Sequence, residues 1–294
     1  MQSVSKQGVA RRAWLGLALV GPLWQAGPAR EPAPESSRLE RVVVIGASLS
    51  AGFGAERSFV DVLAASLRAA NQPPLGLGDE LFFTAPLATG TRQVGAARDA
   101  EPTLVVALDF LFWFGYGTTD AQGGAIELEA ERLELLERGL DLLEVFECPL
   151  VVGDFPDMSA AVGKMLSSEQ MPAQTTLPLL SRRVREWAAE REHTLVLPIA
   201  EIAAQIAAGS SASTGQAIQI GRHTFPPGAR LLQTDELHPT LDGLAAVAQL
   251  VCDQLIAAQL VRAEDFELEL AAVLGKLRRG LVVVPASGQG GLKR

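Results

Sequence analysis

Short apolar runs alternate with longer amphipathic stretches over most of the chain, and this alternation carries most of its structural information. Runs of Val, Ile and Leu that end at Gly or at polar residues are typical of buried strands. The first such run is Val-Val-Val-Ile, which ends at Gly46. Five runs are predicted as strands, at 42–45, 81–84, 104–108, 150–153 and 195–197.

The longer stretches repeat apolar residues at the spacing of an α-helix. The stretch 58–70 begins at Ser58, whose hydroxyl suits an N-cap. Further helices are predicted at 125–146, 177–192 and 241–260, with one more at 263–277. Short strands that alternate with helices imply a parallel sheet covered on both faces by right-handed crossovers. The predicted fold class is therefore α/β, a three-layer αβα sandwich with a doubly wound, mainly parallel five-stranded sheet.

Two other segments depart from this pattern. Residues 207–229 are rich in Gly, Ser and Pro and are predicted to form a long loop. Residues 279–294 end in a Gly-rich, basic stretch that is typical of a flexible tail. The sequence contains no internal repeat, so a single domain over 41–278 is the simplest partition.

The beginning of the chain has the pattern of a signal peptide. Two arginines precede an apolar stretch, 13–24, which is followed by small residues. An uncleaved anchor is the alternative, but a spanning helix needs about 20 apolar residues and Pro22 interrupts this stretch. We therefore predict a signal peptide at 1–30, a linker at 31–40, no stable membrane span, and a secreted, periplasmic or cell-envelope location.

The net charge and the cysteines indicate which classes of partner and ligand site to expect. The formal net charge is -9, and the Lys and Arg residues are scattered. Nucleic-acid binding needs clustered cations, so no nucleic-acid partner is predicted. Cys148 opens an apparent strand and Cys252 lies among apolar helix residues, which favours two separate buried thiols over a disulfide. Neither cysteine has the spacing of metal ligands.

The turn after the first predicted strand, 45–54, holds the strongest candidate chemistry. It stands at the carboxyl end of a parallel strand, where ligands bind in open sheets. A dinucleotide site needs glycines where the chain has Ser48 and Ala51, and a phosphate-binding loop needs a Lys that this turn lacks. The third interpretation makes Ser48 a nucleophile, although a serine in a turn is more often only a hydrogen-bonding residue.

A serine nucleophile needs a base, and the chain has three histidines. His193 follows a charged helix, and His223 lies in the Gly- and Pro-rich segment without a nearby partner in sequence. His238 lies three residues after Asp235, so the carboxylate can bond the imidazole, set its tautomer and stabilise its protonated form. The alternative is a helix-capping segment in which His238 has no chemical role.

Together these segments resemble the SGNH hydrolases, also called GDSL esterases and lipases. The sequence Gly-Ala-Ser-Leu-Ser at 46–50 is similar to the family's first block, G-D-S-L, and Asp235-x-x-His238-Pro239 is similar to its last block, D-x-x-H-P. The resemblance covers about residues 41–260. It implies a flavodoxin-like SGNH fold and a triad of Ser48, His238 and Asp235 that needs no metal or organic cofactor.

The middle of the chain departs from the family pattern. The family binds the oxyanion through the serine N–H, a loop glycine and an Asn side chain. The resemblance assigns the first two to Ser48 and Gly90, but no Asn follows the third predicted strand. Asp109 stands there instead. An ionised carboxylate repels an oxyanion, and a protonated Asp109 can donate to it only if an apolar setting raises its pKa strongly, so we expect Asp109 to hold the strand-end loop together. Ala47 also replaces the first-block Asp.

Three residues that follow predicted strands are candidate pocket residues, namely Asp109, Trp113 and Asp154. Trp113 belongs to an aromatic stretch, for which buried packing is the alternative interpretation. Asp154 follows the fourth predicted strand, where the alternative is a loop cap.

The sequence thus favours a serine hydrolase that cleaves a small-molecule, lipid or glycan ester through an acyl-enzyme on Ser48. The missing Asn favours a second hypothesis, a glycan- or lipid-binding protein of the same fold with little or no catalytic activity. In a third hypothesis, the protein is an O-acyltransferase and a sugar hydroxyl replaces water. A fold resemblance does not separate the three, because function belongs to the site.

Overall fold

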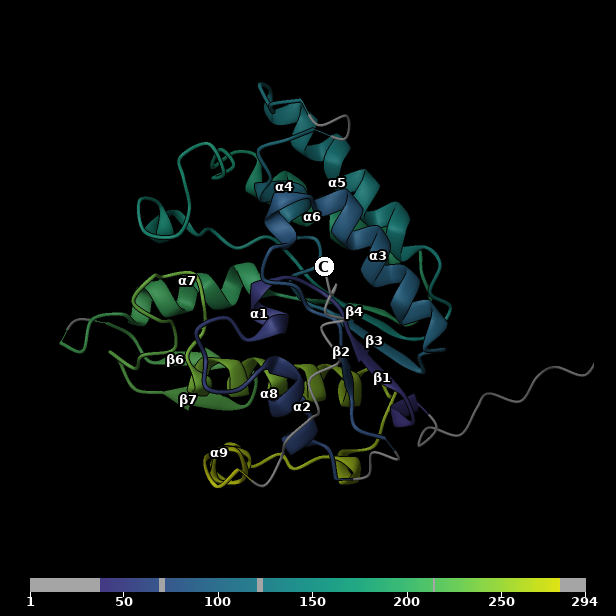
Figure 1. Cartoon of the computed structure of the whole chain (residues 1–294). Coiled ribbons are helices and arrows are strands. Elements are labelled where there is room, and N and C mark those ends of the chain that lie inside the picture. The colour runs from purple at the N-terminus through teal and green to yellow at the C-terminus, as the bar shows by residue number, and fades with distance from the viewer. Residues whose placement is uncertain (1–37, 69–71, 121–123, 214, 281–294) are drawn as a thin grey trace, which may run out of the picture. The chain divides into compact units, whose positions relative to one another are not determined.

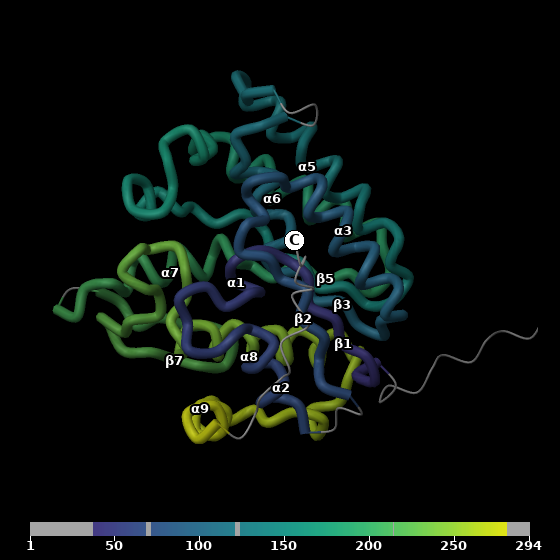
Figure 2. Tube along the Cα trace, viewed as in Figure 1, coloured from purple at the N-terminus to yellow at the C-terminus, as the bar shows by residue number. Residues whose placement is uncertain are grey.

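A computed structural model describes residues 38–68, 72–120, 124–213 and 215–280. The predicted signal peptide, most of the predicted linker and nearly all of the predicted tail lie outside the described residues. Figure 1 shows the arrangement of the helices and strands, and Figure 2 shows the path of the chain in the same view.

The core of the fold is a five-stranded sheet in the order β2-β1-β3-β4-β5. Every neighbouring pair is parallel, so the predicted α/β fold class is confirmed. In this order β3 is the central strand, with β1 and β2 on one side and β4 and β5 on the other. The strands are β1 (Val42–Val44), β2 (Leu75–Gly76), β3 (Leu104–Ala107), β4 (Leu150–Gly153) and β5 (Thr194–Leu197).

The second predicted strand is misplaced. Residues 81–84 form no strand, and Phe82–Thr84 are a short 3-10 helix, η2, that buries Phe82 against Phe110. The true β2 has two residues and one partner at the edge of the sheet, so it is too short to produce an apolar run.

Side chains of successive strand residues point to opposite faces of the sheet and form two separate apolar clusters. Val42 and Val44 belong to the cluster on one face, and Val43 and Val105 belong to the cluster on the other. The first face is covered by α2 (Phe59–Ser66) and α8 (Leu241–Ala257), and α9 (Leu270–Arg278) packs against these two helices (Figure 1). The second is covered by α3 (Pro86–Asp99), α4 (Phe112–Tyr116), α5 (Glu129–Leu143) and α6 (Leu177–Ala189).

Most predicted helices are present but shorter than expected. Helix α2 begins where the sequence places it, because Ser58 and Asp61 form a reciprocal capping box. The region predicted as one helix at 263–277 is divided into a 3-10 turn, η4 (Ala263–Asp265), and α9. The residues between them cross to Ser66, whose carbonyl accepts a 2.7 Å hydrogen bond from the Glu267 N–H.

The segment 207–229 is more ordered than the predicted loop. It contains the end of α7 (Ile199–Gly209) and an antiparallel hairpin of β6 (Ile218–Ile220) and β7 (His223–Phe225). The buried side chains of the hairpin are Ile218 and Ile220, which alternate with an exposed glutamine. Three-residue strands within a Gly- and Ser-rich segment fall below the length at which a periodic pattern becomes visible.

The described residues include both cysteines. Both Cys148 and Cys252 are free thiols, with Cys252 buried and Cys148 partly buried. In the described ranges, helices that combine the length and the apolar character needed to cross a membrane are not found.

Candidate active site

The first element of the site is the turn between β1 and the four-residue helix α1 (Ser48–Ala51). Gly46 has a φ of 149°, and a Cβ atom there would lie 2.1 Å from the Asp109 Oδ1. Only glycine therefore allows β1 to turn here while the Asp109 carboxylate lies against it. The turn places Ser48 at the first position of α1, at the carboxyl end of a central strand.

Asp109, at the end of β3, binds the backbone of α1. Its Oδ2 accepts hydrogen bonds from the Leu49 N–H at 2.8 Å and the Ser50 N–H at 3.3 Å, and its Oδ1 accepts one from the Ser50 hydroxyl at 2.6 Å. Asp109 is partly buried at the edge of the cavity, and burial raises the pKa of its carboxyl group, although the hydrogen bonds partly oppose the shift. Asp109 therefore holds the strand-end loop together, as the sequence predicts.

A buried glutamine that the sequence did not indicate secures the other side of this turn. The Gln93 Oε1 accepts the Gly46 N–H at 2.9 Å, and its Nε2 donates to the Gly46 carbonyl at 2.8 Å. Gln93 comes from α3 and is 3% exposed. One side-chain amide thus satisfies both backbone groups of the glycine that precedes the serine turn. A single glutamine in a helix gives no sequence signal for such a role.

The second element of the site is the turn that carries Asp235 and His238. The Asp235 Oδ2 lies 2.7 Å from the His238 Nδ1, and its Oδ1 accepts the N–H groups of Leu237 and His238 at 3.0 Å each. Because a carboxylate only accepts, Nδ1 is the donor of this contact, and in the neutral imidazole with that tautomer Nε2 is the nitrogen that can accept a proton. Burial raises the pKa of Asp235, but the hydrogen bonds from His238 and Leu237 outweigh it and hold the pKa below its usual value.

Phe53 and Gln233 hold the His238 loop against the segment that follows the serine turn. The Phe53 ring lies 4.6 Å from the His238 ring, centre to centre. The Gln233 N–H donates to the His238 carbonyl at 2.7 Å, and its side-chain amide donates to the carbonyls of Phe53 and Pro239 at 3.0 Å each. Gln233 therefore joins the segment after α1 to the loop that carries His238, and the sequence did not predict this residue either.

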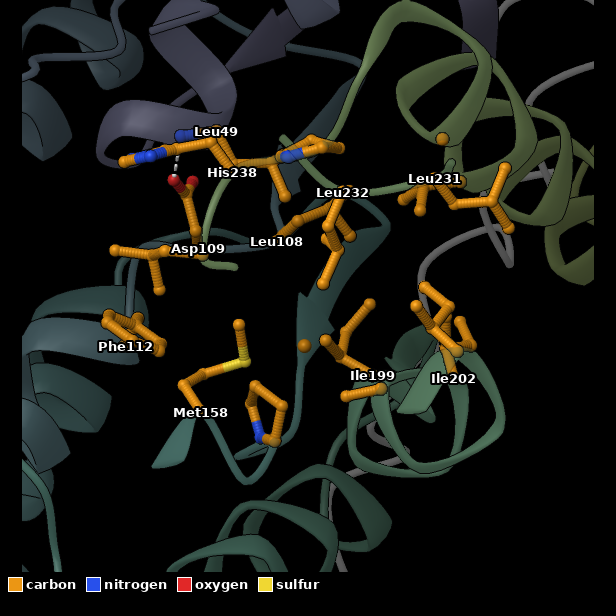
Figure 3. A pocket seen from close by; sticks show the side chains of 18 of the residues that line it. Leu49, Leu108, Asp109, Phe112, Met158, Ile199, Ile202, Leu231, Leu232 and His238 are labelled. Carbon is orange, nitrogen blue, oxygen red and sulfur yellow. Dashed lines mark hydrogen bonds between the residues drawn. The ribbon is translucent and has the colours of Figure 1, made fainter. Parts of the chain in front are cut away.

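Ser48 and His238 line one cavity of about 110 Å³. His238 is 4% exposed, so the imidazole reaches solvent mainly through this space. Figure 3 shows His238 and Leu49 along one wall of the cavity, with Ile199 and Ile202 on the facing wall. The three residues of the predicted triad thus come together at this cavity, two in its wall and Asp235 behind His238.

Of the other predicted site residues, Asp154 also lines the cavity, but its carboxylate is already bound. The Asp154 Oδ1 accepts the Ala200 N–H at 2.8 Å, and its Oδ2 pairs with the Arg185 guanidinium. Its side chain is fully buried. Asp154 therefore caps the start of α7, which agrees with the alternative interpretation as a structural cap.

The structure does not bring Gly90 or Trp113 to the cavity. Gly90 lies inside α3, where a Cβ atom would meet Leu142, Phe110 and Phe114 at 3.0 to 3.2 Å. Trp113 packs between Phe83 and Phe112 in the aromatic cluster. Both residues are buried because the aromatic segment after β3 packs against α3.

The glycine that does approach the serine turn is Gly78, two residues after β2. A Cβ atom on Gly78 would lie 2.6 Å from the Ala51 nitrogen in α1. The sequence pointed to Gly90 because the second strand was placed at 81–84. With β2 at Leu75–Gly76, the loop that follows it begins at Leu77.

Within the described ranges, no group of three or more His, Cys, Asp or Glu side chains is arranged to hold a metal ion.

No protein-family model matches the sequence, and no curated protein matches it. One similar solved structure is a gut microbial diltiazem-metabolizing enzyme, with 14% sequence identity and a TM-score of 0.48. The alignment covers 73% of this chain and 46% of that chain, so this protein spans about half the length of the structure it matches.

Proposed function

We propose that this protein is a serine hydrolase that cleaves carboxylic esters through an acyl-enzyme on Ser48. The observation that carries the proposal is the 2.7 Å contact between the Asp235 Oδ2 and the His238 Nδ1, behind a cavity lined by His238 and Ser48. The resemblance of the 46–50 and Asp235–Pro239 segments to SGNH hydrolases supports the same assignment.

The chemistry follows from the protonation state of His238. Its Nε2 takes the proton of the Ser48 hydroxyl as the oxygen attacks the ester carbonyl carbon, and Asp235 stabilises the imidazolium that forms. The bond from carbon to the alkoxide then breaks, and His238 returns the proton to the leaving alcohol. Water, activated by His238, attacks the acyl-enzyme and releases the acid and free Ser48.

The site has few hydrogen-bond donors to stabilise the oxyanion. Asp109 takes the N–H groups of Leu49 and Ser50, so we assign the oxyanion to the Ser48 N–H, with Gly78 in place of Gly90 as the supporting glycine. Each such donor is worth ~3–4 kcal/mol of barrier in acyl transfer. A site with no Asn donor and with a carboxylate below α1 is expected to be slower than a hydrolase with a full set.

A fluorophosphonate probe tests the proposal without a choice of substrate, because it labels only an activated serine. We expect labelling of the wild type, and loss of labelling in Ser48→Ala and His238→Asn. Ser168→Ala and His193→Asn are matched controls, because both residues are exposed and lie outside the cavity. A folded wild type that resists the probe, or a Ser48→Ala variant that is still labelled, would contradict the proposal.

One observation favours a second candidate function, a binding protein of the same fold. The Asp109 carboxylate lies directly against the backbone N–H groups next to Ser48, where negative charge opposes an oxyanion. A binding protein would keep its affinity for an ester or lipid in Ser48→Ala and would show no turnover in the wild type.

A further inference from the structure

The wall of the cavity opposite His238 is almost entirely aliphatic. Helix α7 contributes Ile199, Ile202 and Ile206, and the hairpin strand β6 contributes Ile220. Leu231, which lies level with His238 in Figure 3, adds to the aliphatic lining. These side chains belong to three segments that are separate in sequence, so the apolar wall is a product of the tertiary structure.

The polar side chains of the lining are few, and half of them are already engaged. Among the described residues that line the cavity, Ser48, Asp109, Asp154 and His238 are polar. Asp109 is bound to α1, and Asp154 is bound to α7 and Arg185. The cavity therefore offers its chemistry at Ser48 and His238 and offers the hydroxyl groups of a sugar few partners beyond them.

We infer that this cavity holds the acyl part of the substrate and that this part is a straight aliphatic chain of about seven to eleven carbons. The length follows from the cavity volume of about 110 Å³, since one water-sized group needs ~10–15 Å³, which leaves room for about seven to eleven such groups. The inference rests on the proposed function, because the acyl carbon must lie at Ser48 for the chain to extend toward α7.

The position of the chain explains how selectivity arises. With the carbonyl carbon at Ser48 and the leaving alcohol toward solvent, the first carbons pass Leu49 and Leu108 and the last ones reach Ile202 and Ile206. Every methylene that enters replaces water contact with apolar contact, which is worth about a fourfold gain in kcat/KM. A chain longer than the cavity gains nothing further.

The test is hydrolysis of 4-nitrophenyl acetate, butyrate, hexanoate, octanoate and dodecanoate. We expect kcat/KM to rise about fourfold per methylene as far as octanoate and to stop rising before dodecanoate. Ile206→Phe fills the far end of the cavity and is expected to lower kcat/KM for octanoate at least tenfold and for acetate less than about twofold. Ile206→Ala enlarges the same end and is expected to move the optimum to a longer chain.

The matched control is Ile256→Phe, the same change at a partly buried isoleucine of the same apolar cluster that does not line the cavity. It should keep the wild-type chain-length profile. A wild type that is labelled by the fluorophosphonate probe but prefers acetate, or an Ile206→Phe variant with an unchanged profile, overturns the inference and leaves the proposed function intact.

A binding measurement separates the remaining outcomes. If the probe does not label Ser48, the melting temperature is measured with and without 1-octanol. A rise in the wild type that Ile206→Phe abolishes keeps the alkyl-chain site while the hydrolase assignment fails. No rise in the wild type rejects both.

Discussion

Two aspartates at the cavity show how one residue type takes opposite roles. Asp109 and Asp235 each accept two backbone N–H groups at 2.8 to 3.3 Å, Asp109 from α1 and Asp235 from its own turn. The remaining partner of Asp109 is the Ser50 hydroxyl, whereas the remaining partner of Asp235 is the His238 imidazole. Burial dominates at Asp109 and raises its pKa, while hydrogen bonds dominate at Asp235 and lower its pKa.

Backbone hydrogen bonds alone do not identify a chemically active carboxylate. The two carboxylates accept similar backbone N–H groups, and they differ in whether their side-chain partner can take up and release a proton. Asp235 can stabilise a protonated imidazole at the cavity, whereas Asp109 binds the backbone and the Ser50 hydroxyl of α1. Three substitutions test this distinction.

The largest effect is expected from Asp235→Asn. The amide still accepts backbone N–H groups through its oxygen, but its NH₂ cannot accept the His238 Nδ1–H, so the imidazole loses the tautomer that leaves Nε2 as base. We expect the rate of fluorophosphonate labelling to fall about 10³- to 10⁴-fold, with little change in stability. The control is Asp242→Asn, at a half-exposed aspartate paired with Arg278. Equal labelling of Asp235→Asn and wild type would remove Asp235 from the triad.

An intermediate effect, on stability, is expected from Asp109→Leu. The change leaves the N–H groups of Leu49 and Ser50 without their acceptor at the start of α1. We expect the free energy of unfolding to fall by about 2–4 kcal/mol. Urea denaturation measures this loss, and Asp109→Asn, which keeps one accepting oxygen, should lose less. If Asp109→Leu were as stable as the wild type, Asp109 would not be the residue that holds α1.

The smallest effect is a difference in pH dependence. A raised pKa means that the unfolded protein ionises first, so the contribution of Asp109 to stability is lost as pH rises from the ordinary aspartate value to the raised one. A lowered pKa has the opposite sign, so the contribution of Asp235 is present above the ordinary value and is lost as pH falls through the lowered one.

Urea denaturation of the wild type and the two Asn variants between pH 3 and pH 7 measures both contributions. Relative to the wild type, Asp109→Asn should become more stable as pH rises, and Asp235→Asn should become more stable as pH falls. Slopes of the same sign for the two variants would show that the two carboxylates do not differ in the way described.

The regions that the sequence predicted well are those with a long or strong pattern. The central strands β1, β3 and β4 read as apolar runs because both of their faces are buried, and α8 reads as a helix because it repeats apolar residues over 17 positions. The two-residue β2 and the three-residue strands of the hairpin had no such pattern. Misplacing β2 then led to Gly90 rather than Gly78.

The site residues also fall into those that a local pattern predicts and those that it does not. Asp235 and His238 are three residues apart, so their contact is formed by one turn and was predictable from the sequence. Gln93 reaches Gly46 across 47 residues, and Gln233 reaches Phe53 across 180. No local pattern reports a contact of that kind, because a glutamine becomes a positioning residue only when the elements around it have packed.

By itself the sequence determined the parallel α/β fold, the serine turn at the end of β1 and the Asp235–His238 pair. Each of these depends on residues that are neighbours along the chain or on a periodic pattern of burial. The tertiary structure alone decided that Gln93 and Gln233 hold the serine turn and the His238 loop, that Gly90 lies inside α3, and that α7 and β6 form the aliphatic wall opposite His238. The physical reason is that these contacts join distant segments, whose meeting depends on how the helices and the hairpin pack at the edge of the sheet.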